Sequence, residues 1–215
     1  TYIGRKIAAH FGEQLNTVIE IGGVDIAFFN GLILEGLYIE DLHKDTLLYM
    51  SKLAVGLSKF DQDYQVLALD ELVLSGTVLN IRKYEGESHL NLQFILDEFR
   101  SGDTTKAGWL VDIETADLQD FRFSYVDENR DSTNSLMDFK NLQISSFTAM
   151  MHDVKLLNDT VWAQIESLSL KEQSGFVVES LSGSIKSSPL ALEAKELMLA
   201  TPLSTVNGQL SFDYT

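Results

Sequence analysis

The chain contains no cysteine among its 215 residues. A disulfide framework and catalysis by a thiolate are therefore both excluded. Only two prolines occur, Pro189 and Pro202, so the chain has few residues that would interrupt a β-sheet. No apolar run approaches the roughly 20 residues that a helix needs to cross a bilayer.

Basic residues are also scarce, with 16 Lys and Arg against 32 Asp and Glu, which gives a net charge of −16 at pH 7. This balance argues against nucleic-acid binding, because phosphates are recognised by clusters of Lys and Arg. It disfavours electrostatic docking on an anionic bilayer surface for the same reason. We interpret the excess of acidic residues as a means of keeping a β-rich surface soluble.

Enzyme motifs are absent as well. The sequence has no G-x-S-x-G, H-E-x-x-H, S-x-x-K, P-loop or G-x-G-x-x-G pattern. The four histidines are scattered, and His43, near Asp41 and Asp45, is the strongest candidate among them. That group could bind a divalent metal, but a polar turn capped by the aspartates is the favoured interpretation. We therefore expect no enzymatic activity, no cofactor and no metal.

What the chain does have is a repeated spacing of apolar residues. Eight-residue windows carry apolar residues at positions 1, 3, 6 and 8 and non-apolar residues at positions 4 and 5. They begin at Ile19, Leu32, Leu48, Leu67, Val111, Met137, Ala149, Ala163, Leu192 and, in a degenerate form, Phe176. A shuffled chain should give only roughly two or three such windows. Most starts are separated by the length of one strand plus a turn.

Strict alternation would place positions 1 and 3 on the opposite face from positions 6 and 8. A β-bulge at positions 4 and 5 restores a common face, and so does a two-residue hairpin loop there. Gly22–Gly23 and Glu35–Gly36 suit such a hairpin, whereas Asp70–Glu71, Glu166–Ser167 and Lys195–Glu196 do not. Bulged or bent strands are therefore predicted for most windows.

The predicted fold is mainly β: a long, curled, largely antiparallel sheet, groove-like or taco-like, with one apolar face. An amphipathic helix is expected over residues 3–15, where Ile3, Ile7, Phe11 and Leu15 share a face, and a short internal helix over 90–100. The first helix could plug the end of the sheet or lie on a membrane, and the plug is favoured. Residues 1–126 are expected to form the helix and first β segment, 127–134 a loop, and 135–215 a second β segment continuous with the first. The alternative is a closed sandwich or barrel with a dry core, acting as a structural or protein-interaction module.

Three stretches carry a family resemblance. They are "LNTVIEIGGVDIAFFNGLILEGLYIEDLHKDTLLYMSKLAVGL" (15–57), "HLNLQFILDEF" (89–99) and "SGFVVESLSGSIKSSPLALEAKELMLATPLSTVNGQLSFDY" (174–214). Together they resemble the TamB-like members of the AsmA superfamily, in the form found in Bacteroidetes. The shared motifs are strand-and-turn patterns rather than a catalytic signature.

The resemblance implies a periplasmic segment of an inner-membrane-anchored envelope protein that moves phospholipids towards the outer membrane. It also implies a link to outer-membrane protein assembly, through a barrel partner. The family's anchoring helix would precede Thr1 and its carboxy-terminal part would follow Thr215, so neither contact is expected within these residues.

Acyl chains are the partner that an apolar groove would accept, because covering apolar surface is favourable by roughly 25 cal/mol per Å² whatever covers it. The expected lining comes from the window positions: Leu32, Leu34, Leu37, Ile39, Leu67, Leu69, Leu72, Leu74, Ile165, Leu168, Leu170, Leu197 and Leu199.

Overall fold

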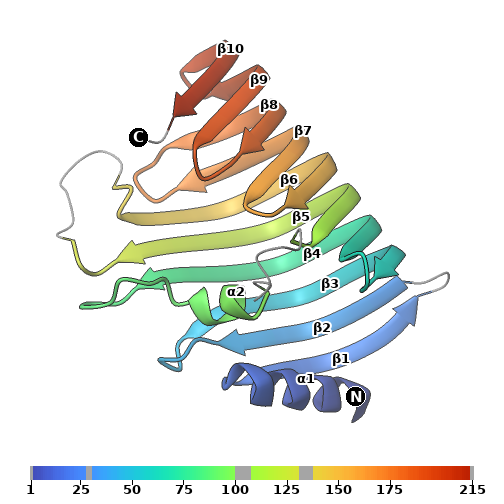
Figure 1. Ribbon diagram of the computed structural model, residues 1–215. Coiled ribbons are helices and arrows are strands. Elements are labelled where there is room, and N and C mark those ends of the chain that lie inside the picture. The colour runs from blue at the N-terminus through green and yellow to red at the C-terminus, as the bar shows by residue number, and fades with distance from the viewer. Residues whose placement is uncertain (1, 28–30, 100–107, 131–137, 214–215) are drawn as a thin grey trace.

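A computed structural model describes residues 2–27, 31–99, 108–130 and 138–213, and its ten strands form one sheet (Figure 1). The strands are β1 (Ile19–Ala27), β2 (Gly31–Glu40), β3 (Thr46–Asp61), β4 (Val66–Lys83), β5 (Leu110–Asp127), β6 (Asn141–Leu157), β7 (Thr160–Glu172), β8 (Val177–Ser187), β9 (Ala191–Thr201) and β10 (Ser204–Asp213). Their order in the sheet is their order in the chain. Only β4 and β5 run parallel, and every other pair of neighbours is antiparallel.

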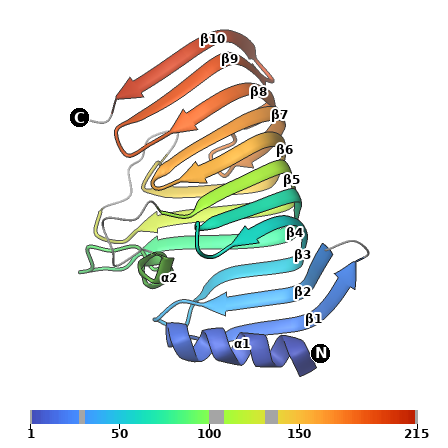
Figure 2. The same cartoon turned by 45° about the vertical axis from the view of Figure 1, so that its right-hand side comes forward.

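The sheet is open. β1 and β10 are its two edges and do not pair with each other, and among the described residues strands contact only their neighbours in the sheet. The mainly β, largely antiparallel prediction is confirmed. The alternative of a closed sandwich or barrel is wrong, because within the described ranges no second layer of strands covers either face and the two edges never meet (Figures 1 and 2).

The repeated windows lie inside single strands. The hairpin interpretation is wrong for Gly22–Gly23 and Glu35–Gly36, which sit within β1 and β2. Register shifts interrupt most of the antiparallel pairings. Bulges fall within some windows, as at Asp70 on β4 and Glu196 on β9, whereas β1 and β2 pair in one unbroken register across their windows. The window at Met137 is the exception: Met137 lies outside the described residues, and β6 begins only at Asn141.

One bulge shows how positions 3 and 6 reach the same face. Leu69 and Leu72 are three residues apart in β4, yet both pack in one apolar cluster with Ile113 and Ala116 of β5. Strict alternation would put them on opposite faces. The Asp70–Glu71 step between them therefore reverses the alternation, as the window pattern predicts.

A second irregularity crosses the sheet where the backbone is left-handed. Gly36 on β2, Gly76 on β4 and Asp120 on β5 have φ values of 61°, 58° and 48°. Glycine adopts this conformation freely, and aspartate tolerates it better than most residues. The strands turn along their length (Figure 2), and these positions let them do so without ending.

The two helices lie at the sheet's margins. α1 (Tyr2–Leu15) runs along β1, and Thr17, just after it, donates from Oγ1 to the carbonyl oxygen of Glu40 at 2.8 Å (Figure 1). α2 (Gln93–Phe99) follows β4. The apolar faces predicted for them include Ile3, Ile7 and Phe99, whose side chains lie outside the described part, so their amphipathic character stays a prediction. Neither helix, over the residues described, is long and apolar enough to span a membrane.

The predicted loop 127–134 begins at Asp127, the last residue of β5, and residues 131–134 of it lie outside the described part. β5 and β6 nevertheless pair with each other from Leu110↔Leu157 to Val126↔Asn141. One sheet therefore continues past this segment.

Candidate functional site

A continuous row of apolar residues crosses all ten strands. Each member is the register partner of the next, so all of them lie on one face of the sheet. We call this set the leucine row; it consists of Val24, Leu34, Leu53, Leu74, Leu118, Ala149, Leu168, Leu181, Leu199 and Val206.

A second row runs beside it, two residues away along most strands and hence on the same face. Its members are Ile26, Leu32, Val55, Leu72, Ala116, Met151 and Ile165, and it reaches Gly183 on β8. The apolar cluster of Leu69, Ile113 and Ala116 shares Ala116 with this row. Two adjacent apolar rows thus make a broad stripe that runs across the strands.

The protein itself leaves this stripe incompletely covered. Of the leucine row only Ala149 is buried, Val206 is 49% exposed, and the other eight residues are half-buried. The whole chain exposes 13664 Å², more than a third above the roughly 9,900 Å² expected for a compact protein of 24.0 kDa. A broad apolar stripe that water still reaches in a folded protein is a candidate binding surface.

The opposite face is polar over β5 to β9. Register partners there include Asp112, Lys155, Trp162, Lys186 and Glu193. Lys155 and Asp112 lie 3.7 Å apart, and Lys186 and Glu193 lie 3.2 Å apart. Such exposed ion pairs contribute little stability. Their charged groups keep this face of the sheet hydrated. The two faces therefore differ in chemistry.

The thirteen residues predicted to line a groove do not all lie together. Leu34, Leu74, Leu168 and Leu199 belong to the leucine row, and Leu32, Leu72 and Ile165 to the second row. Leu67 and Leu69 belong to the apolar cluster of β3–β6. Leu37 and Ile39 lie beyond the Gly36 bend, opposite Met50 and Leu48, while Leu170 pairs with Val178 and Leu197 with Gly208.

Six members of the leucine row were not among those thirteen: Val24, Leu53, Leu118, Ala149, Leu181 and Val206. Leu53 and Leu118 occupy positions 6 and 8 of the windows at Leu48 and Val111, so the sequence pattern already contained them. Leu181 falls in the degenerate window at Phe176. What the sequence lacked was the register, which decides which strand positions stand side by side.

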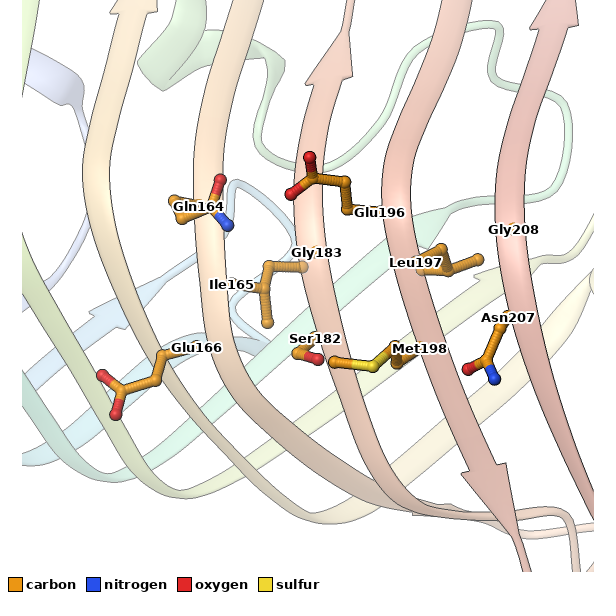
Figure 3. A pocket seen from close by; sticks show the side chains of 10 residues that line it. All are labelled: Gln164, Ile165, Glu166, Ser182, Gly183, Glu196, Leu197, Met198, Asn207 and Gly208. Carbon is orange, nitrogen blue, oxygen red and sulfur yellow. The ribbon is translucent and has the colours of Figure 1, made fainter.

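A hollow of about 580 Å³ lies across β7 to β10, where the strands bend. Figure 3 shows its ten lining residues, which include Ile165, Gly183, Leu197, Met198 and Gly208. Gly183 and Gly208 have no side chain, which leaves room between their neighbours. The hollow thus combines two of the predicted lining residues, Ile165 and Leu197, with polar groups at its margin.

The His43 region is a structural turn. Oδ1 of Asp41 accepts hydrogen bonds from the backbone N–H groups of His43 and Asp45, at 2.9 and 3.0 Å. The favoured interpretation, a turn capped by an aspartate, is confirmed. His43 itself stacks on Tyr84, with ring centroids 3.8 Å apart, and its Nε2 lies 2.8 Å from Oε1 of Glu87.

Asp41 is also the centre of a buried polar cluster that sequence reasoning missed. It is 2% exposed, and its Oδ2 accepts from Asn91 Nδ2 at 2.9 Å and from the Tyr84 hydroxyl at 2.7 Å. Asn91 in turn donates to the Asn80 carbonyl oxygen and accepts from the Arg82 N–H. The cluster ties the β2–β3 turn to the end of β4 and to the start of α2.

In comparisons with known proteins, no family model matches the chain and no curated protein is significantly similar to it.

Proposed function

We propose that the apolar stripe of this sheet is a binding surface for phospholipid acyl chains, without enzymatic activity. The leucine row carries the proposal: ten apolar residues in register across an open sheet, eight of them half-buried. In this function the strands curl around the stripe, as a groove. The described residues supply no second sheet over the stripe, and a lipid tail would supply the missing cover.

The dimensions suit this ligand. Strands in a sheet lie about 4.8 Å apart, so a row across ten strands extends over about 43 Å. The acyl layer of one bilayer leaflet is about 15 Å thick, half of the hydrocarbon core. The stripe is therefore long enough to hold acyl chains along its length, while headgroups stay at the open edge in water.

The TamB-like resemblance supports a biological setting for such a surface. We place the chain in the periplasm, as a segment of an inner-membrane-anchored envelope protein that passes phospholipids towards the outer membrane. A role beside an outer-membrane barrel partner in protein assembly belongs to the same proposal.

The test is phospholipid binding with matched variants on the two faces. The protein is purified from bacteria without detergent, and native mass spectrometry with lipid extraction measures bound phospholipid. Leu74→Gln/Leu199→Gln changes two members of the leucine row on distant strands. Val73→Gln/Met150→Gln changes the neighbours of Leu74 and Ala149, which alternation places on the other face and which do not line the hollow.

We expect phospholipid on the wild-type protein and on the Val73/Met150 variant, and at least a tenfold loss in the Leu74/Leu199 variant. Circular dichroism and urea unfolding check that both variants keep the fold. A wild-type protein that carries no phospholipid and takes up none from phosphatidylethanolamine vesicles would contradict the proposal. Equal losses in both variants would show that the stripe is not the binding surface.

A further inference from the structure

The polar face of the sheet carries a second hollow, of about 430 Å³, which lies over β6 to β9. Six of the side chains that line it belong to register partners on this face: Trp162, Gln164, Ser184, Lys186, Glu193 and Lys195. Each of the four strands has a neighbour on both sides, so the hollow lies within the sheet and not at its edge. It is also separate from the leucine row, which lies on the other face.

Two bulges bend the strands around this hollow. On β6 the pairing with β7 passes from His152 directly to Lys155, so that Asp153 and Val154 together oppose a single residue. A second bulge, on β9, includes Glu196. Asp153 and Glu196 both have a left-handed backbone, with φ values of 50° and 53°. Because a bulge redirects the side chains around it, Asp153 becomes part of the lining.

Most of the polar groups in the hollow are not used by the protein itself. Within the part of the chain that the structure describes, the side chains of Asp153, Gln164 and Lys195 form no hydrogen bond or ion pair. The same holds for the indole N–H of Trp162, whose ring is half-buried. Four groups around one hollow are therefore available to hydrogen-bond a ligand.

The charges of the hollow indicate the class of ligand. They balance, although the chain as a whole carries −16: two carboxylates, of Asp153 and Glu193, face two ammonium groups, of Lys186 and Lys195. A ligand rich in phosphate would require an excess of basic groups. A purely apolar ligand would leave these polar groups buried without partners. A neutral, polar ligand meets neither objection.

A sugar ring is such a ligand. One of its faces presents C–H groups, which pack on the flat apolar surface of an indole such as that of Trp162. Its hydroxyl groups both donate and accept hydrogen bonds, and the hollow offers both carboxylate acceptors and ammonium or amide donors. The volume of about 430 Å³ lies within the roughly 300–1,000 Å³ of small-molecule sites.

We propose that this hollow binds a neutral oligosaccharide, with one pyranose ring on the Trp162 indole and its hydroxyls hydrogen-bonded to Asp153, Gln164 and Lys195. Gln164 also lines the larger hollow across β7 to β10, so the two hollows adjoin (Figure 3). The neighbouring sugar ring occupies that second hollow. The proposal does not depend on lipid binding, which uses the other face of the sheet.

Tryptophan fluorescence tests the binding directly. The chain has two tryptophans, so Trp109→Phe leaves Trp162 as the only indole and keeps an aromatic ring beside Phe60. This variant is titrated with cellotriose, maltotriose and triacetylchitotriose up to about 10 mM, which includes weak binding. Isothermal titration calorimetry of the wild-type chain with the same three sugars gives an independent measurement. We expect a saturable change in Trp162 emission with at least one sugar, at the Kd found by calorimetry.

Matched double variants test the site. Gln164→Leu/Lys195→Met removes two of the available groups from exposed strand positions, and Gln143→Leu/Lys52→Met makes the same changes at exposed positions outside the hollow. We expect the first variant to bind the sugar roughly tenfold more weakly or worse, and the second to bind it like the wild type. Circular dichroism and urea unfolding check that both variants keep the fold.

Three results would overturn the proposal. One is the absence of heat and of any fluorescence change with all three sugars. Another is binding seen by calorimetry that leaves the Trp162 emission unchanged, which would place the site elsewhere. The third is an equal Kd in the two double variants.

Discussion

The hydroxyl of Tyr84 lies 2.7 Å from Oδ2 of Asp41 and 2.8 Å from Oδ2 of Asp45. These two aspartates flank the β2–β3 turn, and Tyr84 follows the end of β4. One phenol therefore joins segments about 40 residues apart, at the corner where the chain leaves the sheet to form α2. Burial, and then the neighbouring carboxylates, raise the pKa of Tyr84, so the hydroxyl keeps its hydrogen at any physiological pH.

Tyr84→Phe should destabilise the protein by about 1–2 kcal/mol, because the buried Asp41 carboxylate loses a hydrogen-bond donor that no water easily replaces. Urea unfolding at pH 7 measures the change. Tyr64→Phe is the matched control, since Tyr64 is 80% exposed and should lose almost nothing. An unchanged free energy of unfolding in Tyr84→Phe would show that the cluster does not hold this corner.

Stability should fall in acid because of Asp41. Burial alone would raise its pKa, but hydrogen bonds from Asn91, Tyr84 and the backbone N–H groups of Asp45 and His43 hold the pKa below the ordinary 3.8. A lowered folded-state pKa stabilises the fold fully above the unfolded-state value, and this contribution is lost as the pH falls through the folded pKa.

The free energy of unfolding of the wild-type protein should therefore drop below about pH 4. Asp41→Asn should be less stable at pH 7 and should show a shallower decline in acid. Urea titrations between pH 3 and 7 compare the two proteins. Parallel curves would mean that other carboxylates govern the acid response.

Gly183→Ala should be far more damaging than Gly208→Ala, although both glycines line the same hollow. Gly183 has a φ of 138°, and a Cβ there would lie 2.9 Å from the Lys195 carbonyl oxygen. Gly208 has no atom within 4 Å of such a Cβ. We expect a loss of roughly 2–3 kcal/mol for Gly183→Ala and almost none for Gly208→Ala. Similar losses in urea unfolding would contradict the geometry of this bend.

The proposed lipid surface should prefer zwitterionic headgroups. With a net charge of −16, the chain repels phosphatidylglycerol more than phosphatidylethanolamine, and salt screens that repulsion. Uptake of each lipid from vesicles, measured at 0.01 and 0.5 M NaCl, should differ at low salt and converge at high salt. A preference for the anionic lipid at low salt would contradict this expectation.

Many of the strands could be predicted because the spacing of apolar residues that marks a strand lies within that strand. Alternation with a two-residue step is visible in any one window, and this spacing alone predicts that Leu69 and Leu72 share a face. The windows Ala116–Phe123 and Leu142–Ala149 follow the same spacing, although they are not among the ten windows that led to the prediction. Asp120 and Ser146 occupy their fifth positions and have φ values of 48° and 52°, so these windows also mark bends.

The features that could not be predicted depend on contacts between residues far apart in the sequence. The parallel pairing of β4 with β5 depends on how the chain returns after α2, and no period within either strand reveals it. The polar cluster joins Asp41 to Asn91, 50 residues away, through side chains that are unremarkable in the sequence. Predicting the leucine row likewise requires the registers of all nine strand pairings. An error of one residue in any of them would put the wrong residue in the row.

The agreement between strand order and chain order has a consequence for how the protein folds. Antiparallel neighbours joined by a short turn can pair one after another. Each new strand pairs with the strand that precedes it in the chain, so the contacts that form are local in sequence. The parallel join between β4 and β5 is different, because the chain must first travel back across the sheet. We therefore expect β1–β4 and β5–β10 to form independently and to pair with each other last, along β4 and β5. Pulsed hydrogen exchange during refolding would detect it as late protection of the amides that link Val66–Lys83 to Leu110–Asp127.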